Sequence, residues 1–318
     1  MQRSSERPAD VASDTPSSLA CPTCATPFDG PYCHQCGERK LRPGEFSFWF
    51  WLRALIARFT QLDGPFAKAT ISLFARPGSL TTDYFRGKRI PYARPIQYFL
   101  VANVIFFVVG AWLGIDTLST PLRSHLRSRP SFHAQDARSW VENRLGTTLK
   151  DLEARGANDE LTRSFLALSD RFDVLGDSLS RTLVFSLVPM FFAASFFLTR
   201  LTKSNRRRLV SEHFVSSLHF VGYFLLAQVL LFALFIGVGG IAEAFGTRAV
   251  RAFLLHDRAL GPALAAFLVW YGYGAAQRFH GFGRPGAIVM ALTLLPVSFG
   301  ALTIYRSLLF YVTQWQFA

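Results

Sequence analysis

Residues 214–241 read FVSSLHFVGYFLLAQVLLFALFIGVGGI, a stretch of 28 residues without Asp, Glu, Lys or Arg. About 20 apolar residues in a row can cross the hydrocarbon core of a bilayer as a helix, so this stretch predicts a membrane span. Half of the 318 residues are hydrophobic and only 17% are charged, yet the formal net charge is +13. Such a chain is either a membrane protein with basic loops or a nucleic-acid binder with a large core.

Other parts of the chain have the same apolar character. Each run has about 17 or more residues, the lower limit for a span, and each lacks Asp, Glu, Lys and Arg. The runs are Pro95–Gly114, Thr182–Leu198, Leu260–Ala276 and Ala287–Ile304. The sequence therefore predicts an all-α polytopic membrane protein with about five transmembrane helices in a domain of residues 95–318. Residues 115–181 form a long loop within that domain.

The basic residues predict the orientation of these spans. Segments 75–94 and 199–213 together hold ten basic residues and two acidic ones. Both segments lie on the cytoplasmic side if the N-terminus is inside, as the positive-inside rule requires. We therefore expect a multi-pass protein of the bacterial inner membrane with a cytoplasmic N-terminus. The positive charge then reports membrane topology and predicts no nucleic-acid partner.

All four cysteines of the chain lie in a short segment near the N-terminus, as Cys21-Pro-Thr-Cys24 and Cys33-His-Gln-Cys36. Two Cys-x-x-Cys pairs supply four thiolates, which is the ligand set of a closed structural zinc site. Two disulfides or a redox Cys-x-x-Cys pair are the alternatives, but disulfides need an oxidising compartment, and the expected cytoplasmic side is reducing. We predict a zinc ribbon over residues 21–40 that follows a disordered leader, residues 1–20, and holds one structural zinc ion.

Residues 41–94 connect the ribbon to the first span. Residues 46–74 are aromatic-rich but interrupted by charges, which indicates either amphipathic helices in the headgroup region or a helical hairpin packed on the ribbon. The segment that follows is basic, and its charges either only set the orientation or also bind the bilayer's anionic lipid headgroups. The candidate headgroup-contacting residues are Arg86, Lys88, Arg89 and Arg94.

The long loop contains a helical pattern with apolar residues spaced alternately by four and three positions. This stripe comprises Leu161, Phe165, Leu168, Phe172, Leu175 and Leu179. Spacing of this kind places the residues along one face of a helix, which we expect to pack within the molecule or against a second copy. Because the second span follows directly, one helix is expected to run from the loop into the membrane.

A few polar side chains lie within or next to the apolar runs and form a possible intramembrane site. They are Asn103, Glu212, His213, His219, Tyr223 and Gln228. A histidine at membrane depth is a functional candidate by default, although polar residues in spans also join helices by hydrogen bonds. Glu212 is expected to pair with the arginines at 206–208.

Several of these segments resemble a bacterial membrane family described as domain of unknown function 3667. The resemblance rests on the four-cysteine ribbon, on Arg76-Pro77-Gly78, on Gly87-Lys88-Arg89, and on Glu212-His213 followed by Leu218-His219-Phe220. Members often carry a further histidine where this chain has Val221. The resemblance implies an integral membrane protein and no established activity.

Three functional hypotheses follow from the sequence. The first is a non-enzymatic interaction or scaffold protein whose ribbon binds a cytosolic protein partner. The second is a small-solute transporter or channel lined by the polar residues of the spans. The third is a membrane-embedded enzyme acting on lipid with His213 or His219 as its base. No catalytic residue is assigned, because the sequence has no nucleotide-binding loop, nucleophile elbow or metalloprotease motif.

Overall fold

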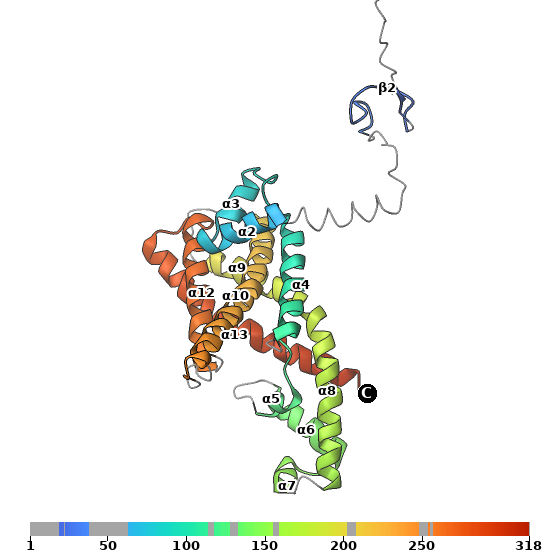
Figure 1. The fold of residues 1–318 in the computed structure, drawn as a ribbon, viewed down its shortest axis with the longest axis vertical. Coiled ribbons are helices and arrows are strands. Elements are labelled where there is room, and N and C mark those ends of the chain that lie inside the picture. Colours follow the sequence, from blue (N-terminus) through green and yellow to red (C-terminus); the bar gives the residue numbers. More distant parts are fainter. Residues whose placement is uncertain are drawn as a thin grey trace, which may run out of the picture. The chain divides into compact units, whose positions relative to one another are not determined.

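The computed structural model divides the chain into two compact units, Met1–Gln61 and Leu62–Ala318. Figure 1 shows the elements of both units, which are described separately below. The structure describes residues 19–21, 23–37, 63–113, 118–127, 133–154, 159–201, 208–247, 254 and 257–317.

The N-terminal unit contains a small ribbon with two short antiparallel strands, β1 (Leu19–Ala20) and β2 (Pro27–Phe28). Leu19 pairs with Phe28, whose buried side chain packs with Cys21 and Cys33. Among the described residues, Leu19 and Ala20 precede the predicted ribbon of residues 21–40 and pair with β2. Residues 1–18 of the predicted leader and residues 38–40 of the predicted ribbon lie outside the described residues.

The membrane unit contains the predicted five spans, since five helices of the described chain are long and apolar enough to cross a bilayer. They are α4 (Pro95–Leu113), the continuous helix Glu160–Arg200, α10 (Val210–Ala244), α12 (Asp257–Arg278) and α13 (Arg284–Trp315). The helix 160–200 consists of α8 (Glu160–Leu183), one 3₁₀ turn η1 (Val184–Ser186) and α9 (Leu187–Leu201). The expected all-α membrane fold is thus confirmed.

Helix α10 occupies the centre of this unit and packs against α2, α3, α4, α9 and α12. Its contact with α4 is close because Gly222 has no side chain. A Cβ atom on Gly222 would lie only 2.7 Å from the ring of Tyr98 on α4. Small residues in membrane helices permit such close backbone approach, since association there depends on packing.

Two short helices, α2 (Asp63–Ala75) and α3 (Ser79–Phe85), cover one end of the membrane helices, which we call the α3 end. The Ala69 and Leu73 side chains of α2 are fully buried in the main core. The indole of Trp270 on α12 donates to the Phe74 carbonyl at 2.8 Å. For residues 46–74 the sequence predicted either amphipathic helices in the headgroup region or a hairpin on the ribbon, and neither prediction included packing of α2 on the membrane helices. Trp49, Trp51 and the rest of 46–62 lie outside the described residues.

The long loop folds at the opposite end, which we call the α6 end, into α5 (Leu122–Arg127), α6 (Ala134–Leu145), α7 (Leu149–Ala154) and the start of α8. The apolar stripe of α8 packs within the molecule, as Leu168 and Phe172 form one core with Val141 of α6 and Phe310 of α13. The intramolecular alternative for the stripe is therefore confirmed, and one helix continues from the loop into the span.

Candidate functional site

The four cysteines form a cluster in which all ligand atoms lie within 4.8 Å of one another. The Sγ atoms of Cys21 and Cys36 are 3.4 Å apart, and those of Cys24 and Cys33 are 3.6 Å apart. Thiolates placed tetrahedrally at 2.3 Å from zinc would be separated by about 3.8 Å. The four cysteines are thus brought together as predicted and could hold one metal ion.

Both Cys-x-x-Cys turns have the same backbone form. Ala25 N–H donates to the Cys21 carbonyl at 2.8 Å, and Gly37 N–H donates to the Cys33 carbonyl at 2.9 Å. The residue after each turn has a positive φ, 59° at Ala25 and 77° at Gly37. Ala25 therefore adopts the conformation that favours glycine, which indicates that the cluster geometry dictates the backbone.

The environment of Cys24 favours the thiolate that binds metals. Hydrogen bonds to the side chain and the backbone of Thr26 lower the pKa of Cys24 from its usual 9.0 to about 6. Cys21 and Cys33 are buried, whereas Cys36 is exposed at the ribbon surface. A thiol with a lowered pKa binds a cation without the cost of removing a proton at neutral pH.

The predicted headgroup-contacting residues lie on the exposed connection between α3 and α4. Arg86, Lys88, Arg89 and Arg94 are all exposed, and Ile90 among them is 97% exposed. The Arg89 guanidinium stands 4.7 Å from the ring centre of Tyr84, and its Nε donates to the Tyr84 carbonyl at 3.3 Å. Lys88 lies 3.9 Å from Asp83, a long and exposed ion pair that leaves its charge accessible. We call residues 86–94 the basic loop.

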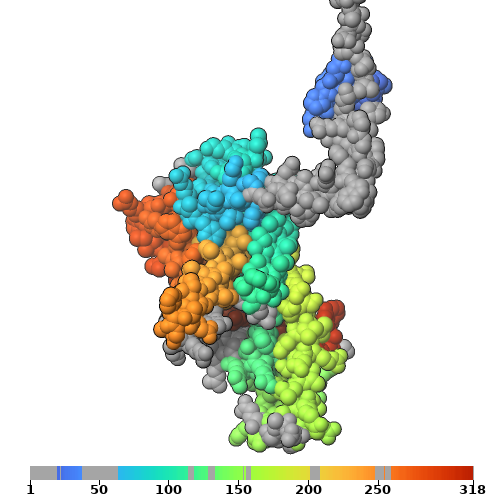
Figure 2. All heavy atoms as spheres, in the orientation of Figure 1, coloured from blue at the N-terminus to red at the C-terminus, as the bar shows by residue number. Residues whose placement is uncertain are grey.

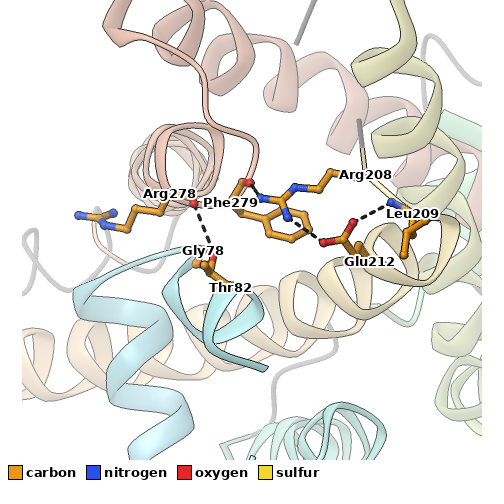
Figure 3. Close-up of polar contacts among 7 residues, drawn as sticks. All are labelled: Gly78, Thr82, Arg208, Leu209, Glu212, Arg278 and Phe279. Atoms are coloured by element: carbon orange, nitrogen blue, oxygen red, sulfur yellow. Dashed lines mark hydrogen bonds and ion pairs between the residues drawn. The ribbon is translucent and has the colours of Figure 1, made fainter. Parts of the chain in front are cut away.

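The basic loop is anchored through α3, which packs tightly on the end of α12 (Figure 3). Gly78, with φ 85°, stands so close to α12 that a Cβ atom there would lie 2.7 Å from the Ala275 Cα atom. Thr82 donates to the Arg278 carbonyl at 3.3 Å, and Arg278 donates to the Pro77 carbonyl at 3.3 Å. In Figure 2 the surface of α2 and α3 borders directly on that of α12, so this end of the unit forms one continuous layer.

An ion pair joins the start of α10 to the same layer. Arg208 donates to Glu212 Oε1 at 2.7 Å, and the pair is only 13% and 10% exposed. The Glu212 Oε2 atom accepts from the Leu209 N–H at 2.7 Å, which caps the helix. Arg208 also donates to the Phe279 carbonyl and covers the Phe279 ring at 4.4 Å, as Figure 3 shows. The predicted pairing of Glu212 is confirmed for Arg208.

His219 and Tyr223 are buried side chains of α10. The Nδ1 atom of His219 lies 2.8 Å from the Thr81 hydroxyl of α3, and both side chains are buried. The Tyr223 hydroxyl donates to the Phe267 carbonyl of α12 at 2.9 Å. These two residues therefore join α10 to α3 and to α12. This agrees with the alternative that polar residues in spans join helices by hydrogen bonds.

His213 faces a different helix. Its Nδ1 atom lies 2.9 Å from the Ser195 hydroxyl of α9, and its ring stacks on His280 at 6.0 Å. His280 and Ser195 line a small cavity of about 80 Å³ between α9, α10, α12 and α13. His280 follows α12, and its burial lowers its pKa from 6.5 to about 3, so it is neutral at neutral pH.

The six polar candidates do not form one site. Asn103 and Gln228 are both buried, yet only Gln228 of the six lines the larger of the cavities in the described part of the chain. That cavity lies toward the α6 end, whereas Glu212, His213 and His219 contact elements of the α3 end. The structure thus separates residues that the sequence suggested as a single possible intramembrane site.

A second histidine cluster, which the sequence pattern does not single out, lies in the folded loop. His125 Nδ1 is 2.7 Å from His133 Nε2, and His133 Nδ1 is 2.7 Å from the Ser307 hydroxyl of α13. Burial lowers the pKa of His125 to about 3 and also lowers that of His133. Arg306 lies beside this cluster, two residues beyond the predicted end of the fifth span at Ile304. The helix α13 extends beyond the predicted span, and the absence of any Gly or Pro between residues 305 and 315 could have indicated this longer helix.

Comparison with known proteins gives a match that covers the α2–α3 region and most of the first span. No curated protein and no solved structure matches the chain. Residues 63–107 comprise α2, α3, the basic loop and most of α4, and thus include the close contact at Gly78. These residues match the model of a family described as Protein of unknown function (DUF3667), which confirms the resemblance expected from the sequence.

Proposed function

We propose that this multi-pass membrane protein is a non-enzymatic interaction protein with two recognition elements. The basic loop binds anionic lipid headgroups at the cytoplasmic face of a bacterial inner membrane. The four-cysteine ribbon holds a structural zinc ion and binds a cytosolic protein partner. The observation that carries the proposal is the accessibility of the four charged side chains of the basic loop, directly before the span α4.

Electrostatics and anchoring support lipid binding by this loop. Each lysine or arginine near an anionic membrane surface contributes about 1 kcal/mol. The exposed Ile90 adds an apolar side chain that can enter the headgroup region. Because Gly78 and Thr82 hold α3 on α12, the loop is presented from a packed layer at the end of the spans.

Lipid binding is tested on the purified full chain in neutral detergent by native mass spectrometry with added phosphatidylglycerol. The variant Arg86→Gln should raise the apparent Kd about fivefold, and Arg86→Gln/Lys88→Gln/Arg89→Gln about a hundredfold, at about 1 kcal/mol for each charge. The matched control is Arg181→Gln, an exposed arginine of α8. Equal Kd values for the triple variant and the wild type would contradict the proposal.

The ribbon is tested separately by pull-down with intact protein and with the Cys36→Ser variant. Cys36 is the exposed member of the cluster, so its loss should release the metal with little effect on the membrane unit. Partners that depend on the ribbon should disappear from the variant sample. Identical partner sets would remove the ribbon from the proposed function and would leave the lipid result intact.

A further inference from the structure

A large cavity lies between α10, α12, α13 and the segment that precedes α5, away from the basic loop. It has a volume of about 780 Å³ and is partly open, and its lining combines polar and apolar side chains. Thr120, Gln228 and Arg306 contribute polar groups, and apolar residues such as Phe224, Leu264 and Phe299 cover other parts of the wall.

Arg306 gives the cavity a positive charge. It is the only charged residue among the described residues that line the cavity. Within the described part of the chain, no carboxylate lies within ion-pair distance of its guanidinium. Arg306 is exposed, so its guanidinium is accessible to a ligand that enters the cavity.

The depth of Arg306 matches a lipid headgroup. It is 22 residues after Arg284, the first residue of α13. At 1.5 Å per residue this separation is about 33 Å along the helix. The hydrocarbon core of a bilayer is about 30 Å thick, so a guanidinium at this distance reaches the headgroup level at the α6 end.

Two further polar groups in the lining have unsatisfied hydrogen-bonding capacity. The Gln228 Nε2 atom and the Thr120 Oγ1 atom are buried and have no hydrogen-bond partner among the described residues. Both side chains are 7% exposed. Buried polar atoms in native proteins nearly always have a partner, so each of these side chains has a hydrogen bond to offer when it turns toward the cavity that it lines. An amide N–H, a hydroxyl and a guanidinium are together the donors that suit an oxyanion.

The size and apolar walls of the cavity favour an amphiphilic ligand over a lone anion. Pockets for small molecules measure about 300–1,000 Å³, so a lone anion would leave most of this cavity without contacts. We propose that the cavity binds an anionic phospholipid, with the phosphate on Arg306 and Gln228 and an acyl chain along Phe224, Leu264 and Phe299. This site is separate from the basic loop, and either proposal can fail without the other.

The test uses the purified full chain and phosphatidylglycerol that carries a photoreactive diazirine in its acyl chain. Irradiation should label peptides of α10, α12 or α13 that line the cavity, and Arg306→Gln should raise the apparent Kd of this site about tenfold, since a hydrogen bond to a charged group is lost. Arg306→Lys should retain most of the binding, and Arg181→Gln should not change it. Thr303→Phe, which fills the cavity without removing a charge, should also displace the lipid.

Several results would overturn the proposal. They are labelling confined to peptides outside the cavity, an unchanged Kd in both Arg306→Gln and Thr303→Phe, and equal affinity for phosphatidylcholine. Full competition by oleate at equal concentration would assign the site to a carboxylate amphiphile and would also overturn it. The triple variant of the basic loop should keep the photolabelling, and this result separates the cavity from the proposed function.

Discussion

Replacing Gly78 with alanine should destabilise the membrane unit through two separate effects. Gly78 has φ 85°, a region that residues with a side chain rarely adopt. A Cβ atom there would also lie 2.7 Å from the Ala275 Cα atom and 3.2 Å from the Gly274 carbonyl oxygen. Carbon atoms in contact are normally about 3.5–4.0 Å apart. Both neighbours are backbone atoms of α12, so neither can move aside as a flexible side chain would.

Each effect has a typical size in free energy. The left-handed conformation costs about 1–2 kcal/mol for a residue with a side chain. Overpacking in a tightly packed region costs about 1–3 kcal/mol more. We therefore expect Gly78→Ala to lower the free energy of unfolding by about 2–5 kcal/mol.

Gly87 provides a matched control, because it has a similar φ of 92° but no atom within 4 Å of a Cβ placed there. Gly87→Ala should therefore cost only the conformational part, about 1–2 kcal/mol. The measurement is unfolding of the purified full chain by SDS titration in mild detergent. Equal losses of unfolding free energy in the two variants would refute the argument that the close approach of α3 to α12 requires glycine.

Other perturbations test the ion pair, the metal and the buried histidines. Glu212→Gln should cost about 3–5 kcal/mol of unfolding free energy because it leaves Arg208 buried without its carboxylate. Arg181→Gln, which breaks an exposed pair, should cost at most about 1 kcal/mol; similar losses would contradict this contrast. Metal analysis should find one zinc ion per chain and a loss of it in Cys36→Ser, and an absence of zinc from the intact protein would refute the zinc site. Burial lowers the pKa of His125 from 6.5 to about 3, so below pH 6.5 the unfolded chain binds protons first and stability falls, by up to about 1.4 kcal/mol per pH unit. His125→Phe should reduce this pH dependence of thermal unfolding, to which the buried His133 and His280 also contribute, and an unchanged profile would exclude His125 as a source.

Several features followed from local patterns in the chain. The spans are visible in the sequence because about 20 apolar residues in a row have no stable alternative to burial in lipid or in a core. The four-cysteine cluster follows from spacing alone, since each Cys-x-x-Cys turn brings two thiols together. The pairing of Glu212 with Arg208 is also local, because four residues separate them.

Contacts between distant segments were not available from these patterns. The packing of α2 on α10 and α12 depends on which face of a short helix meets the spans, and Phe74 and Trp270 are 196 residues apart. The hydrogen bond between His133 and Ser307 joins residues 174 positions apart. Neither pair leaves a periodic signal, because each is a single contact.

The sequence by itself determined that this is a membrane protein with five apolar helices and a possible metal ribbon, because composition and short spacings govern those properties. Only the tertiary structure decided which polar residues act together. It separated His213, His219 and Gln228, although they lie on one helix, because each faces a different neighbour. It also placed Arg306 in the wall of a cavity, because helices far apart in the chain enclose that space.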